Sequence, residues 1–126
     1  MSFDIHVRRF RDGDILDADA ALVRSLLAPF LVEQGGGWNL RMDEADAEVY
    51  GVETLERGFM VTHVSGVALY DLVVRVAAAC DFVIMPVGCP VALTSEQQRA
   101  HLPDGFDGDA VVVSSGAELI QLIRNS

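Results

Sequence analysis

The side chains in this sequence with the most evident chemical potential are His63, Ser65 and Cys89. A serine or cysteine becomes a nucleophile when a histidine lies within hydrogen-bond distance and takes its proton. His63 and Ser65 lie at the end of one apolar stretch, and Cys89 follows the next. If the ends of the corresponding strands line a pocket, with 99–103 as a lid, the three would serve a small enzyme or a small-molecule sensor.

Each of these residues also has a structural explanation, which we prefer. Ser65 and Gly66 stand directly before a predicted helix, where a serine hydroxyl can accept a hydrogen bond from the first turn. Cys80 and Cys89 have no histidine or cysteine partner at metal-ligand spacing, so both are expected to be reduced structural thiols. We therefore assign no catalytic residue and expect a binding function rather than an enzyme.

The charge of the chain narrows the choice of partner. Nineteen acidic residues against nine basic ones give a formal net charge of −10, and all the basic residues are arginines. The negative electrostatic field of such a chain repels nucleic acid and anionic membranes, whereas it attracts a basic protein. The densest acidic group is Asp43, Glu44, Asp46 and Glu48, which we predict to be the binding edge of an inhibitor-like or immunity-like protein.

The sequence supports neither a cofactor nor a metal. Gly35, Gly36 and Gly37 are followed by Trp38, and not by the Lys-Ser or Lys-Thr pair of a phosphate loop. His6 and His63 fall on strands that a split-βαβ sheet would place side by side, but a third ligand is lacking. We therefore predict no bound cofactor and no metal site.

The stretch 59–90 is the most apolar part of the chain, and the other elements are expected to pack around it. Its pattern predicts a strand over 59–64, a helix over 67–80 and a strand over 82–87. Within the helix, Asp71 and Arg75 are four residues apart and are expected to pair on its one exposed face.

The remaining elements follow from alternation and from helix caps. Residues 3–7 alternate as a strand with Phe3, Ile5 and Val7 toward the core and Asp4, His6 and Arg8 toward the other face. Asp17 is the expected N-cap of the next helix. After a glycine-rich loop at 33–37, residues 38–58 predict one strand or a short hairpin with an acidic turn at 43–46. Ser95 and Gln98 form a capping box before a short helix, and a strand over 109–113 precedes a helix that Ser115 opens.

This order predicts a single α/β domain over residues 1–126. Its first six elements match the βαββαβ pattern of a split-βαβ, ferredoxin-like fold, to which the last strand and helix add a C-terminal extension. A three-layer α/β sandwich is the alternative, because the last two strands are apolar on both faces.

Two further expectations concern assembly and location. In a two-layer fold, Phe59, Val61, Phe82 or Ile84 would face water as an apolar patch. Either the C-terminal helix over 117–124 covers this patch in a three-layer monomer, or a second subunit does; we favour the second subunit, which predicts a two-fold homodimer. The sequence has no apolar run of 18 residues and no secretory signal at its N-terminus, so we expect a cytoplasmic protein.

Overall fold

The computed structural model describes residues 4–106 and 108–126. Within them, the helices are α1 (Ala20–Leu27), α2 (Val67–Cys80) and α3 (Gly116–Arg124), with short 3-10 helices η1 (Ala28–Phe30), η2 (Val52–Arg57) and η3 (Glu96–His101). The strands are β1 (Ile5–Arg8), β2 (Phe10–Arg11), β3 (Asp14–Ile15), β4 (Leu31–Gln34), β5 (Gly37–Met42), β6 (Ala45–Tyr50), β7 (Phe59–Ser65), β8 (Val83–Pro86), β9 (Ala92–Leu93) and β10 (Val111–Val112).

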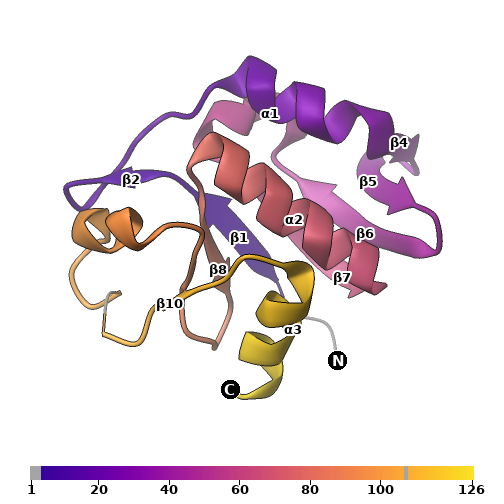
Figure 1. Ribbon diagram of the computed structural model, residues 1–126. Helices are drawn as coiled ribbons and strands as arrows, with labels where there is room; N and C mark the ends of the chain where they lie inside the picture. Colours follow the sequence, from indigo (N-terminus) through magenta and orange to yellow (C-terminus); the bar gives the residue numbers. More distant parts are fainter. Residues whose placement is uncertain (1–3, 107) are drawn as a thin grey trace.

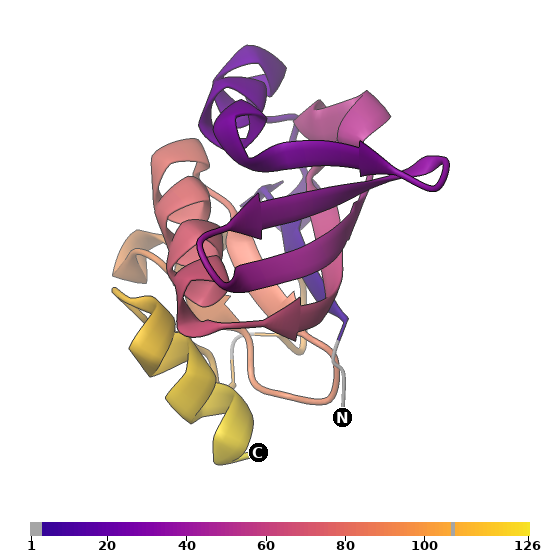
Figure 2. The same cartoon turned by 90° about the vertical axis from the view of Figure 1, so that its right-hand side faces the viewer.

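Eight of these strands form one sheet in the order β10-β9-β8-β1-β7-β6-β5-β4, and β2 and β3 form a separate hairpin. All neighbouring strands of the large sheet are antiparallel except β9 and β10. The helices α1, α2 and α3 lie on one face of this sheet (Figures 1 and 2). The fold is therefore a two-layer mixture of helices and sheet, and the three-layer alternative is not observed.

The predicted central unit is confirmed. Helix α2 joins β7 to β8, and both strands pair antiparallel with β1, which lies between them. Leu69, Leu72, Val73 and Val76 of α2 are buried in the main core, as expected of a helix with so few charges. This helix contacts β5 to β8 as well as α1 and α3, so the helical layer is organised around it.

The exact ferredoxin-like topology is not confirmed. Strands β7 and β8 are parallel, α2 joins them, and β1 lies between them, as in a split βαβ unit. However, four strands, β4 to β7, follow α1, where the predicted pattern has two. In the glycine-rich loop predicted at 33–37, only Gly35 and Gly36 form a turn, and the neighbouring residues belong to β4 and β5, so β4 was missed at the edge of the sheet.

The predicted cap at Ser65 is wrong. The N-cap of α2 is Gly66, and no side chain caps this helix. Gly66 has φ 94°, which L side chains rarely adopt, and a Cβ there would lie 2.6 Å from the Cβ of Ala45. The chain thus enters α2 through a conformation that only glycine fits, while Ser65 remains in the strand opposite Asp46.

Three other local predictions are corrected. The N-cap of α1 is Asp19, whose Oδ1 accepts a hydrogen bond from the Leu22 amide at 3.2 Å, and not Asp17. The carboxylate of Asp71 does not pair with Arg75 but accepts a hydrogen bond of 2.7 Å from the Gly116 amide, which joins α2 to α3. The last strand, predicted over 109–113, is only β10, whose two side chains are exposed, while Ala110 and Val113 on either side of it are buried.

The premise of the dimer prediction is also wrong. Phe59, Val61, Phe82 and Ile84 are all at most 5% exposed and belong to the main core under the helices. None of them forms an apolar patch on the surface. The two-fold dimer stays a prediction, but these four residues no longer argue for it.

The caps give a direct test of the structure. Ser115 Oγ accepts a hydrogen bond from the Glu118 amide at 3.1 Å at the start of α3, whereas Ser65 caps no helix. We predict that Ser115→Ala lowers the free energy of unfolding by about 1 kcal/mol. Ser65→Ala, the matched control, should change it by less than about 0.5 kcal/mol, as exposed substitutions usually do. Urea unfolding measures both, and a larger loss from Ser65→Ala would contradict the corrected cap.

Candidate functional site

The face of the sheet opposite the helices carries a row of half-exposed side chains. Ile5 and Val7 of β1 point into the main core, so His6 and Arg8 point to the other face. His6 stands opposite Met60 of β7 on one side and Met85 of β8 on the other. We call this surface the helix-free face.

A cavity of about 640 Å³ opens over β1 and β8 on the helix-free face. We call it the groove. Its lining is mostly apolar, and three of its side chains, Ile15, Val87 and Phe106, are exposed by 54, 55 and 39%. The polar side chains in the lining are His6, Arg8, Cys89 and Asp109. Both the volume and the mixture of apolar and few polar groups are typical of a small-molecule site.

The walls of the groove belong to a second, smaller core. Val83, Leu93, Leu102 and Ala110 form this cluster, and Phe10, Met85 and Val91 of the groove pack against it. The rings of Phe10 and Phe106 meet edge to face, with centroids 6.4 Å apart. The hairpin β2-β3, with Phe10 and Ile15, therefore lines one side of the groove, and Pro103, Gly105, Phe106 and Asp109 line another.

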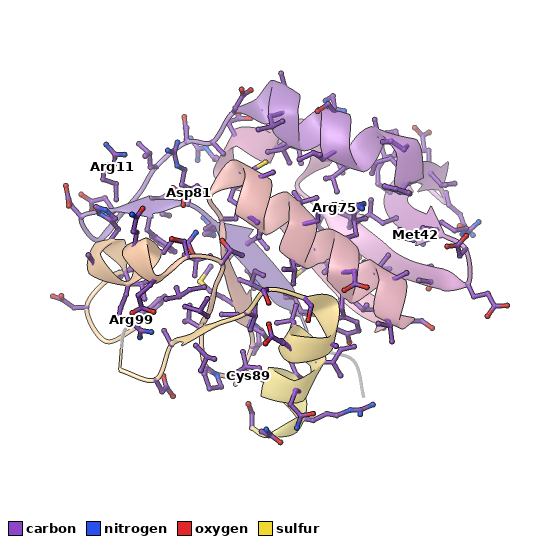
Figure 3. The ribbon with its side chains drawn as sticks, viewed as in Figure 1. Arg11, Met42, Arg75, Asp81, Cys89 and Arg99 are labelled. Carbon is purple, nitrogen blue, oxygen red and sulfur yellow. The ribbon has the colours of Figure 1, made fainter. Side chains whose placement is uncertain are left out.

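The segment that carries one wall is held by buried hydrogen bonds. Gln98 of η3 is only 6% exposed, and its Nε2 donates to the Phe82 carbonyl at 3.1 Å and to Asp81 Oδ1 at 3.0 Å. Arg99 donates to the Ala110 carbonyl at 3.0 Å. Figure 3 shows Asp81 at the end of α2 and Arg99 on the segment that follows β9. These bonds fix η3 against the end of α2.

A smaller cavity of about 320 Å³ adjoins the groove. His6 and Arg8 line both cavities, and Tyr50, Thr54 and Arg57 complete the polar lining of the smaller one. Arg57 comes close to β1 because Gly58 follows it: a Cβ on Gly58 would overlap the Val7 carbonyl oxygen. The close packing of residue 58 on β1 thus places two arginines on one surface.

The structure does not bring His63, Ser65 and Cys89 together as a set. His63 Nδ1 lies 2.5 Å from Glu48 Oε2, and Ser65 is opposite Asp46. Cys89 lines the groove, whose lining contains neither His63 nor Ser65, and its Sγ donates to the Val87 carbonyl at 3.8 Å. Figure 3 shows Cys89 in the loop beyond the end of β8. Of the three residues, only Cys89 lines the groove.

The predicted acidic group lies on one hairpin. Asp43 and Glu44 form the turn between β5 and β6, with Asp43 at φ 49°, and both are exposed. Asp46 and Glu48 follow on β6, on the side opposite the buried Ala45, Ala47 and Val49. Asp46 stands opposite Arg41 in the register, and Glu48 pairs with His63. The four carboxylates thus project from the hairpin tip and from the helix-free face.

Sequence reasoning missed the role of His6 and Arg8. Alternation along β1 correctly placed both opposite the core, which was the available signal. Nothing in the local pattern indicated that Phe106 would meet Phe10 and Ile15 of the β2-β3 hairpin over β8, because Phe106 is far from them in the chain. A site that is formed by such contacts has no sequence motif of neighbouring residues by which it could be found.

Comparisons with known proteins identify no relative of this chain. Neither protein-family models, curated proteins nor solved structures yielded a match to the chain. Across residues 4–106 and 108–126, no three or more His, Cys, Asp or Glu residues are grouped as they would be to hold a metal ion. In the same residues, no helix has the length and apolar character needed to cross a membrane.

The two cysteines provide a chemical probe of the groove. Burial raises the pKa of the Cys80 thiol, and the Asp19 carboxylate raises it further. Cys80, the last residue of α2, is buried, whereas Cys89 is half-exposed in the groove. Because the thiolate is the reactive form, a raised pKa and burial both slow modification of Cys80.

We predict that iodoacetamide at pH 8 modifies Cys89 at least about tenfold faster than Cys80 in the folded protein. Peptide mass spectrometry over time measures both rates, and Cys89→Ser serves as the control that leaves only the slow site. Equal rates in the folded protein would contradict this description of the groove.

Proposed function

We propose that the protein binds a small molecule in the groove. The observation that carries the proposal is the cavity of about 640 Å³ on a sheet face that the helices leave uncovered. Its lining combines exposed apolar side chains with a few polar ones, which gives an apolar ligand both burial and orientation. The class of protein supported best is thus a small single-domain ligand-binding protein.

The surroundings of Cys89 support binding over nucleophilic catalysis. Its thiol donates toward a backbone carbonyl, and its neighbours in the groove are mainly apolar. A catalytic thiol needs a base within hydrogen-bond reach, and the hydrogen bonds of the described residues give Cys89 none. The sensor version of the small-molecule hypothesis is therefore favoured over the enzyme version.

A pair of matched substitutions tests this proposal. Val87 and Val67 are exposed by 55 and 57%, but only Val87 lines the groove, whereas Val67 begins α2 on the helical side. We predict that Val87→Glu abolishes or weakens small-molecule binding at least about tenfold, because it removes apolar contact and adds a charge in the site. Val67→Glu should leave the affinity unchanged.

Native mass spectrometry of the purified chain, followed by an NMR fragment screen, would find the ligands for this comparison. Co-purified molecules and hits that shift groove residues are expected. A screen without any hit in the groove, or hits unaffected by Val87→Glu, would contradict the proposal.

A second candidate function is recognition of a basic protein partner, as in an inhibitor or immunity protein. The observation that favours it is the position of Asp43, Glu44 and Asp46, which are exposed together on one hairpin of a chain with net charge −10. Such a cluster accelerates the encounter with a basic surface.

Replacing Asp43, Glu44, Asp46 and Glu48 together by Asn or Ser tests the second candidate. We predict that this change slows association with the basic partner and flattens its salt dependence. The control removes Asp14, Asp17, Glu33 and Glu53, four exposed carboxylates elsewhere, so that both variants shift the net charge from −10 to −6. Surface plasmon resonance measures the association of each variant with partners captured from lysate. Equal effects of the two variants would mean that the hairpin contributes only to solubility.

A further inference from the structure

Arg8 is a partly buried charged side chain that has no partner among residues 4–106 and 108–126. Three arginines are half-buried: Arg9, Arg99 and Arg8. Arg9 pairs with Asp81 and Arg99 with Glu96, but Arg8 makes no hydrogen bond or ion pair with any described residue. A guanidinium that loses water without gaining an anion is destabilising, unless a ligand supplies that anion.

The surroundings of Arg8 are basic in an otherwise acidic protein. Arg57 and His6 line the same small cavity, and Arg57 likewise makes no hydrogen bond or ion pair with the described residues. The lining of this cavity, as far as the structure describes it, contains no carboxylate. Asp109 is in the lining of the groove only. The small cavity thus has a local positive charge that a net charge of −10 does not predict.

The apolar and the basic parts of the site are continuous. His6 and Arg8 line both cavities, so they stand at the boundary between the groove and the small cavity. On one side of this boundary lie Phe10, Ile15 and Phe106, and on the other lies Arg57. A ligand that spans the boundary would meet apolar side chains at one end and two guanidinium groups at the other.

We propose that the ligand of the groove is an amphipathic anion. Its carboxylate or phosphate head would bind Arg8 and Arg57, because guanidinium groups match both kinds of head with paired hydrogen bonds. Its apolar chain or ring would lie along the groove against Phe10 and Phe106. This inference rests on the proposed small-molecule function and specifies its ligand class.

Isothermal titration with three probes of equal chain length tests the ligand class. Decanoate, decyl phosphate and decanol are compared below their aggregation concentrations, and the tighter of the two anions identifies the head group. We predict that at least one anion binds at least about tenfold tighter than decanol, because hydrogen bonds to charged groups are the stronger ones. Bound anion should also slow iodoacetamide modification of Cys89.

Two double variants separate local charge from total charge. Arg8→Gln with Arg57→Gln should weaken anion binding at least about tenfold while decanol binding changes little. The control, Arg75→Gln with Arg124→Gln, removes two exposed arginines from α2 and α3 on the helical side. It should leave all affinities unchanged, and circular dichroism verifies that both variants are folded.

Three outcomes would overturn the inference in distinguishable ways. If decanol binds as tightly as the anions and the Arg8–Arg57 variant has no effect, the groove binds ligands but the anionic class is wrong. If anions bind but neither Val87→Glu nor the Arg8–Arg57 variant weakens them, the binding site lies elsewhere. If none of the probes binds and the fragment screen also finds no groove ligand, the proposed function fails together with the inference.

Discussion

The burial of α2 against the sheet is the constraint on which the rest of the structure depends. Because β7 and β8 run in the same direction with β1 between them, the chain must cross one face of the sheet to join them, and α2 makes this crossing. Helix α3 then packs on α2 so closely that its first residue, Gly116, has no room for a side chain against Asp71. The helical layer is thus built on one face, and the other face is left to segments that also form the groove.

The sequence predicted the elements whose signal is local. The run of apolar residues around α2, the capping box at Ser95 and the serine N-cap at Ser115 specify those helices without help from distant contacts, and the structure confirms them. The N-cap of α2 was predicted at Ser65 because a serine hydroxyl commonly caps a helix. The close approach of Ala45 instead leaves room only for a glycine at the next position, and this glycine is the N-cap. The edge strand β4 was missed because a row of glycines reads as a flexible loop unless its pairing with β5 is known.

The candidate site likewise combines a part with a local sequence signal and a part that depends on distant contacts. Alternation in β1 places His6 and Arg8 on the correct face, but their partners, Phe106 and Arg57, come from other parts of the chain. Charge reasoning from composition was likewise incomplete, since it describes the field of the whole molecule and not its distribution. On the helix-free face, the carboxylates of the β5-β6 hairpin and the guanidinium groups beside the groove are separate regions of opposite sign. The net value of −10 hides this division.

The hydrogen bonds of Gln98 have a consequence for the kinetics of any binding event. They attach η3 to Asp81 and Phe82, directly after α2. Beyond the other end of the wall, the amide of Val111 donates a hydrogen bond to the Val91 carbonyl at 2.9 Å. The wall of the groove is therefore anchored on both sides before a ligand arrives. A pre-formed wall loses little conformational entropy on binding and needs no closing step. Entry should then depend on encounter alone, with a rate proportional to ligand concentration and without saturation.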